Sequence, residues 1–160
     1  MVRLAAPAIG GRAVLLTLGI LLAFGAAPAR AQQPAQPSPF VFNSDAGVIL
    51  NFVKADKTAD FESVLNKLKE GLAKSEKPER KAMAAGWKIF KANESNNGLA
   101  IYVFIIDPAA KGQEYSVGNL LVEAFGAEEG NKLYKSYSDS YGNPAIGALL
   151  HLNAFLDLGK

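Results

Sequence analysis

Residues 99–106 (LAIYVFII) constrain the fold more than any other segment of the chain. The run is rich in β-branched and aromatic residues, which indicates a β-strand. Successive side chains of a strand point to opposite faces of its sheet. Both sets are apolar here: Leu99, Ile101, Val103 and Ile105 on one face, and Ala100, Tyr102, Phe104 and Ile106 on the other. Such a strand needs cover on both faces.

A second strand is predicted directly before this one. Residues 86–92 (GWKIFKA) alternate in the manner of a strand, and Asn97-Gly98 separates them from residue 99. Asn-Gly is a strong signal for a tight turn between antiparallel strands. The two strands therefore form a hairpin, which Asp107-Pro108 ends.

Apolar residues at helical spacing predict helices on either side of the hairpin. Gly126 and Gly130 interrupt the second pattern, which indicates a broken helix or two helices. Pro78 lies in a charged connector after the first helix. The apolar positions are Phe61, Val64, Leu65, Leu68 and Leu72 in the first helix, Val117, Leu120, Leu121, Ala124 and Phe125 in the second, and Leu133, Tyr134, Tyr137 and Tyr141 beyond the glycines.

Strands over residues 48–54 and 147–155 complete the order βαββαβ, with Gly142-Asn143-Pro144 as a stop before the last strand. This order is that of the ferredoxin-like plan. We therefore expect an α+β fold with a four-stranded antiparallel sheet, both helices on one face, and the first strand beside the last. The other face is then open and apolar, so we expect a second copy to cover it as a homodimer. The alternative is a monomer in which residues 40–42 cover that face.

Residues 1–31 have the three parts of a cleavable export signal. Arg3 and Arg12 supply positive charge, residues 13–24 form an uncharged apolar run, and residues 29–31 (ARA) give a cleavage site. A membrane anchor is the alternative, but the run is shorter than the ~20 residues that span a bilayer. We predict a periplasmic or secreted protein without a stable membrane anchor, with a flexible Gln/Pro-rich linker over residues 32–46 and one folded domain over residues 47–157.

The composition excludes several classes of function. The chain has no cysteine, so disulfides, thiolate nucleophiles and thiolate metal sites are absent. Its formal net charge is +2, but three of its 17 basic residues and none of its 15 acidic residues lie in residues 1–31. The remaining chain is nearly neutral, so we expect no nucleic-acid partner.

Residues 48–68 (VILNFVKADKTADFESVLNKL) resemble the opening of the dimeric α/β barrel superfamily, which includes antibiotic-biosynthesis-type monooxygenases and uncharacterised exported bacterial proteins. There the first strand ends in a V-K-P-G-K-like turn, matched here by residues 53–57 (VKADK). A helix then begins with an F-x-x-x-L pattern, matched by Phe61 and Leu65. The resemblance implies a barrel of two chains that holds an aromatic molecule without a cofactor. Residues 120–137 depart from the monooxygenases, because they contain neither the tryptophan nor the histidine common in that helix.

Polar residues that interrupt apolar strands are the candidates for a ligand site. Asn51 lies within the first strand, and His151, the only histidine, lies two residues before Asn153 in the last. If they share the face away from the helices, they line the barrel interior, and Tyr102 and Trp87 are candidates to join them. An apolar cavity with a few polar groups is the usual form of a small-molecule site.

Two interpretations of these residues remain open. In one, His151 is a base or a hydrogen-bond partner, while Asn51 and Asn153 bind a carbonyl or enolate oxygen. In the other, all three are structural and their hydrogen bonds are satisfied locally. We expect no metal, because one histidine and no cysteine leave only carboxylates as ligands. We expect no cofactor, because no glycine-rich phosphate loop is present.

We therefore predict an exported α/β-barrel protein that binds a small apolar or aromatic molecule. The alternatives are a cofactor-independent monooxygenase or isomerase, and a structural or interaction dimer of the cell envelope.

Overall fold

A four-stranded antiparallel sheet forms the centre of the computed structural model, which describes residues 38–158. The sheet order is β3-β4-β2-β6, so β2 pairs with both β4 and β6 and the expected pairing of the first and last long strands is confirmed. The predicted export signal lies outside the described residues. The long strands are β2 (Ala46–Lys54), β3 (Trp87–Asn96), β4 (Leu99–Ile106) and β6 (Tyr141–Leu152).

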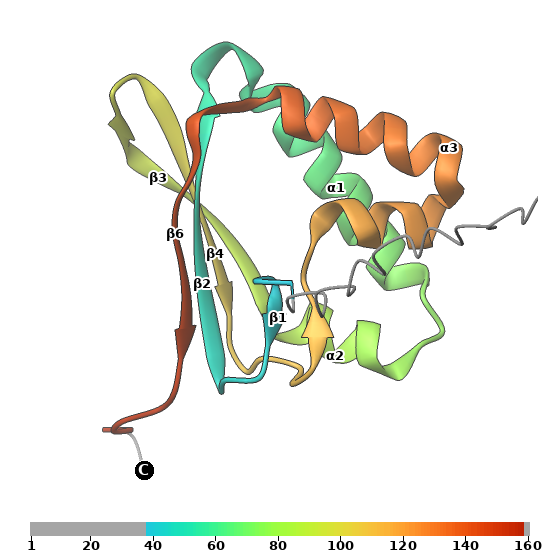
Figure 1. The fold of residues 1–160 in the computed structure, drawn as a ribbon, viewed down its shortest axis with the longest axis vertical. Helices are drawn as coiled ribbons and strands as arrows, with labels where there is room; N and C mark the ends of the chain where they lie inside the picture. Colours follow the sequence, from blue (N-terminus) through green and yellow to red (C-terminus); the bar gives the residue numbers. More distant parts are fainter. Residues whose placement is uncertain (1–37, 159–160) are drawn as a thin grey trace, which may run out of the picture. The chain divides into compact units, whose positions relative to one another are not determined.

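Within residues 38–158, three α-helices lie on one side of this sheet (Figure 1). They are α1 (Thr58–Lys74), α2 (Pro78–Gly86) and α3 (Val117–Asp139), and a short 3-10 helix, η1 (Ala55–Lys57), leads into α1. The protein is therefore an α+β fold.

The core lies between the sheet and α1 and α3. Ile49 and Phe104 are direct neighbours across β2 and β4, and both are buried under the helices. The ring of Phe61 from α1 lies 4.7 Å from that of Tyr102 and 5.0 Å from that of Tyr137, measured between centroids. The predicted apolar stripe of α1 is thus its buried face.

Gly126 breaks α3 into two halves, as the glycine pattern predicts. Its φ and ψ of 81° and 170° are not helical and belong to a region that glycine alone adopts readily. At Gly130 the second half passes so close to the first that a Cβ atom would lie 2.5 Å from the Cα atom of Val122.

Several predicted boundaries are wrong. Residues 78–85, expected in a connector, and Gly86, expected in a strand, form α2. Pro78 is tolerated at the first helical position because it lacks only an N–H that has no partner there anyway. The last strand, β6, runs from Tyr141 to Leu152 rather than from residue 147 to residue 155, so Tyr141 is not part of the helix and Asn153 is not part of the strand. The expected stop, Gly142-Asn143-Pro144, is accommodated because the register between β6 and β2 shifts twice along this edge strand.

Residues 38–46, predicted as part of the flexible linker, belong to the fold. β1 (Val41–Phe42) pairs with β5 (Gln113–Glu114), and the ring of Phe42 is fully buried. That ring lies where a Cβ of Gly47 would be, so the close approach requires glycine. Because Gly47 shares its face with buried Ile49, residues 40–42 lie on the helix side and do not cover the open face, and that alternative is wrong.

The opposite face of the sheet is covered by no element of residues 38–158 (Figure 1). Phe90 and Leu150 are about half exposed there, at 51% and 48%. We call this surface the open face. By the strand register its apolar side chains are Val48, Leu50 and Phe52 of β2, Phe90 of β3, Ile101, Val103 and Ile105 of β4, and Ala148, Leu150 and Leu152 of β6.

Candidate functional site

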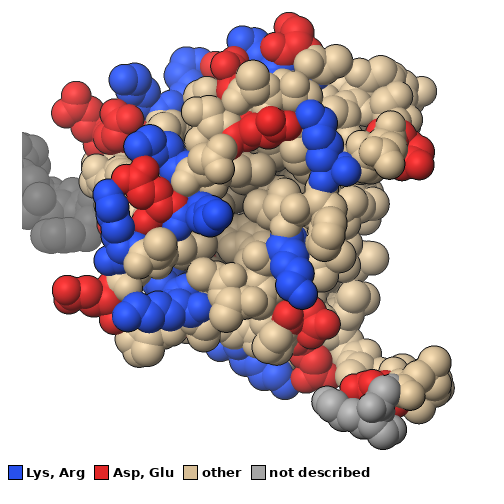
Figure 2. Space-filling view, turned by 180° about the vertical axis from the view of Figure 1, so that it is seen from behind, with Lys and Arg blue, Asp and Glu red and all other residues tan. Residues whose placement is uncertain are grey.

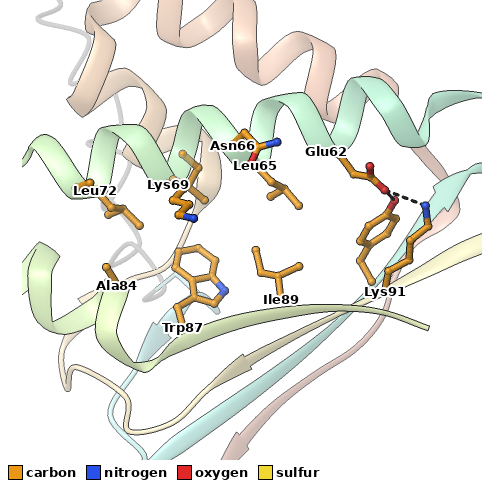
Figure 3. A pocket seen from close by; sticks show the side chains of 12 residues that line it. Glu62, Leu65, Asn66, Lys69, Leu72, Ala84, Trp87, Ile89 and Lys91 are labelled. Atoms are coloured by element: carbon orange, nitrogen blue, oxygen red, sulfur yellow. Dashed lines mark hydrogen bonds and ion pairs between the residues drawn. The ribbon is translucent and has the colours of Figure 1, made fainter. Parts of the chain in front are cut away.

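A groove of about 710 Å³ lies between α1 and the edge strand β3 (Figure 3). We call it the α1–β3 groove. Seen from behind, the molecule has an uncharged hollow bordered by basic and acidic side chains (Figure 2). The groove contains two of the predicted site residues, Trp87 and Tyr102. Its apolar lining is Leu65, Leu68, Leu72, Ala73, Ala84, Trp87 and Ile89, and its polar lining is Glu62, Asn66, Lys69, Lys91 and Tyr102.

The periodicities of one helix and one strand build this groove. In α1 the lining residues Glu62, Leu65 and Lys69 recur at helical spacing beside the buried stripe. In β3, Trp87, Ile89 and Lys91 alternate and therefore point to the same side of the sheet. The two rows face each other (Figure 3) because α1 passes over the edge of the sheet.

A compact polar cluster closes one end of the groove. The carboxylate of Glu62 accepts hydrogen bonds from the ammonium of Lys91 at 2.9 Å and from the hydroxyl of Tyr102 at 2.5 Å. The Lys91 ammonium, and secondly the Tyr102 hydroxyl, lower the pKa of Glu62. Burial, and then the Glu62 carboxylate, raise the pKa of Tyr102, so its hydroxyl keeps its proton as a donor. The cluster satisfies its own charges.

Trp87 forms the floor at the other end of the groove. Its ring meets the rings of Phe104 and Tyr115 edge-to-face, with centroids 5.7 Å and 5.2 Å apart, which fixes its orientation. Its indole Nε1–H is buried and has no hydrogen-bond partner. A buried donor without a partner costs about 1–3 kcal/mol. In Figure 3 this nitrogen faces along the groove floor towards Ile89, and Lys69 extends towards the indole from α1.

Asn51 lies in a different place, at the start of a buried hydrogen-bond chain. Its Oδ1 accepts a hydrogen bond from the Tyr141 hydroxyl at 2.7 Å, and its Nδ2 donates to the carbonyls of Ile49 and Tyr102, each at 3.3 Å. The hydroxyl oxygens of Tyr141 and Tyr137 are 2.5 Å apart. Because Tyr141 has one hydrogen and gives it to Asn51, Tyr137 is the donor to Tyr141.

Asn51, Tyr137 and Tyr141 line a second hollow of about 300 Å³ between β6 and α3. Burial raises the pKa of both phenols, so both stay protonated. Each polar side-chain atom in this hydrogen-bond chain of Asn51, Tyr141 and Tyr137 has a partner, which fits the structural interpretation of Asn51.

The predicted site residues do not converge on the open face. The strand register places Asn51 opposite Ile146 and His151 opposite Gly47, both on the helix-covered side, so the condition for lining a barrel interior is not met. The His151 ring lies 4.5 Å from that of Phe42, and its Nε2 lies 3.1 Å from the carbonyl oxygen of Pro39. Asn153 is exposed beyond the end of β6.

Sequence reasoning did not find Glu62, Lys69 and Lys91. The signal was present for Glu62 and Lys69, which lie three residues before and four residues after Leu65 on one border of the apolar stripe. For Lys91 the signal was its alternation with Trp87 in the second predicted strand.

Among the residues from 38 to 158, no three potential metal-ligating side chains come together, and no helix has the length and apolar character needed to cross a membrane. Of the two hollows described above, the α1–β3 groove has the greater volume, about 710 Å³ against about 300 Å³. Membership of the dimeric α/β barrel superfamily, suggested by the resemblance of residues 48–68, stays a prediction. In comparisons with known proteins, no family model, curated protein or solved structure matches the chain.

Proposed function

We propose that the protein binds a small molecule with an apolar or aromatic body in the α1–β3 groove. The observation that carries the proposal is the unpartnered indole N–H of Trp87 in the wall of an apolar groove. A bound molecule with a hydrogen-bond acceptor would satisfy that donor, and its body would cover Leu65 and Ile89. The volume of about 710 Å³ lies within the usual range for small-molecule sites.

The proposal moves the ligand from a barrel interior to the helix side of the sheet. His151 contacts Phe42 and Pro39 and lines neither hollow, so nothing supports a base acting beside Asn51. Binding without catalysis is therefore the function we favour over a monooxygenase or an isomerase. Export of the protein remains a prediction from residues outside the described range.

The only tryptophan of the chain is a reporter inside the groove. We would titrate the protein with N-phenyl-1-naphthylamine, a neutral apolar fluorophore, and follow energy transfer from Trp87. Saturable transfer at one probe per chain is expected. Ala84→Phe, which fills the groove, should weaken binding, whereas Ala85→Phe on the same helix but outside the lining should not. Equal binding by the two variants, or no saturation, would overturn the proposal.

We propose that the partner of this protein is a second copy of itself, bound through the open face. The support for this pairing is the apolar character of four adjacent strands on that face and the absence of any covering element within residues 38–158. We further propose that the fold follows the ferredoxin-like plan. The sheet order, with α1 and α2 between β2 and β3 and α3 between β4 and β6, supports this.

Analytical ultracentrifugation tests the pairing. Phe90 is half exposed, so Phe90→Lys should leave the fold intact and shift the mass from two chains to one. Phe90→Leu is the matched control and should remain dimeric. A parent protein of one chain at all concentrations would exclude the pairing.

A further inference from the structure

We propose that the ligand of the α1–β3 groove is an anionic amphiphile whose carboxylate is bound by Lys69 and the indole N–H of Trp87. This inference rests on the proposed function, because it names the chemical class of the molecule bound in the same groove. It has three separate supports: the charge balance of the lining, the unpartnered donor, and the apolar path beside both.

The charge balance of the groove leaves one positive charge without a partner. The lining contains three charged residues, Glu62, Lys69 and Lys91. Glu62 and Lys91 form an ion pair at 2.9 Å. Lys69 forms no ion pair with any residue between 38 and 158. Its chain neighbour Glu70 is already paired with Lys67 and Lys74. The groove therefore favours a negative charge.

Two of the hydrogen-bonding groups in this part of the lining are donors only. Lys69 donates only, and the Nε1 atom of Trp87 donates only. A carboxylate accepts from both at once, and hydrogen bonds to an ionised acceptor are the stronger kind. An ammonium group would meet a like charge and a donor, and an alcohol would lack the charge that Lys69 favours. The Nε1 atom is covered in the unliganded groove, so binding of the carboxylate requires the side chains beside it to move.

The apolar body has a path that continues from this point. Leu65 of α1 and Ile89 of β3 face each other across the groove between Trp87 and the Glu62 cluster (Figure 3). Because Glu62, Lys91 and Tyr102 satisfy one another, that end offers no competing site for the carboxylate. The ligand therefore lies with its head at Lys69 and its apolar chain along Leu65 and Ile89.

Competition with N-phenyl-1-naphthylamine tests the inference. Decanoate, 1-decanol and decyltrimethylammonium have the same alkyl chain and differ in the charge of the head. We expect decanoate at pH 7.5 to displace the probe at a concentration on the order of tenfold lower than decanol, because of the charge-assisted hydrogen bonds. Decyltrimethylammonium should be the weakest competitor.

Lys69→Met should remove the advantage of decanoate over decanol and leave decanol unchanged. Lys67→Met is the matched control, because Lys67 is an exposed lysine of α1 outside the groove lining. Equal displacement by decanoate and decanol, or an unchanged preference in Lys69→Met, would overturn the carboxylate assignment while the groove still bound the neutral probe. No binding of the neutral probe would instead overturn the proposed function.

Discussion

The hydroxyl of Tyr102 lies 2.5 Å from the Oε1 atom of Glu62, although 40 positions separate the two residues in the chain. The contact joins strand β4, the neighbour of the edge strand β3, to α1 and closes one end of the α1–β3 groove. Its donor is buried and its acceptor is partly exposed, so the effects of breaking it can be measured without exposing the core.

Tyr102→Phe removes this donor and should lower the free energy of unfolding at pH 7 by about 1 kcal/mol. The pKa of Glu62 should rise towards its ordinary value of 4.5. Because the pKa of Glu62 is lower in the folded protein than in the unfolded chain, its carboxylate stabilises the fold fully above pH 4.5. This contribution is lost as the pH falls through the folded-state pKa. The variant should therefore approach the parent in stability below pH 4.5. Urea unfolding at pH 7 and at a pH below 4.5, together with an NMR titration of Glu62, checks this prediction.

Lys91→Met is the matched comparison, because Lys91 is the main cause of the lowered pKa. It should raise the pKa of Glu62 further than Tyr102→Phe does. An identical titration of Glu62 in the parent and both variants would contradict the cluster.

Stability should fall in alkaline solution because of the buried phenols. The pKa values of Tyr137 and Tyr141 are raised above 10.0 by burial, so both stay protonated in the fold when they ionise in the unfolded chain. Their stabilising effect is complete below pH 10 and is lost above it, by about 1.4 kcal/mol per pH unit for each phenol. Tyr137→Phe should make the decline shallower in urea unfolding between pH 9 and 11. An equally steep decline in Tyr137→Phe and the parent would contradict this prediction.

Gly126→Ala should destabilise the fold through backbone conformation alone. The φ of 81° disfavours a side chain, and nothing lies within 4 Å of the Cβ position. The expected loss is about 1–3 kcal/mol in urea unfolding. Ala127→Gly, at the next and exposed position, should cost at most about 1 kcal/mol. If Gly126→Ala were neutral, the break in α3 would not be held by this residue.

Phe42→Ala should cost about 3–5 kcal/mol, because the ring is fully buried against Tyr115 and Gly47. Asn43→Ala, its exposed neighbour, should change stability by less than about 0.5 kcal/mol. A loss in Phe42→Ala no greater than in Asn43→Ala would mean that residues 38–46 are the flexible linker that their composition suggests.

Much of the sheet could be predicted because its signals are local. Strand β4 is an unbroken run of apolar and aromatic residues, and Asn97-Gly98 marks the turn before it. The break at Gly126 followed from glycine interrupting an apolar period. Helix α2 could not be found in the same way, since only Met83 and Gly86 of its nine residues are buried and it has almost no apolar stripe.

The site could be predicted only in part, because both faces of β2 are apolar. Val48 and Leu50 point to one side and Ile49 and Val53 to the other, so the pattern cannot tell which face the helices cover. The side on which Asn51 lies depends on this choice. Trp87 and Tyr102 were found as single residues, but their common groove depends on where α1 crosses the sheet, which is a long-range property.

The two outer strands of the sheet also limit how molecules of this protein can associate. β6 carries Pro144, which has no N–H to offer a further strand, and β3 shifts its register between Lys91 and Ser95. An incoming chain therefore finds no long, regular row of backbone donors and acceptors at either edge. Within residues 38–158 one apolar face of the sheet is uncovered, and these edges guard against growth into a continuous fibre. Contacts between molecules are thereby confined to broad surfaces.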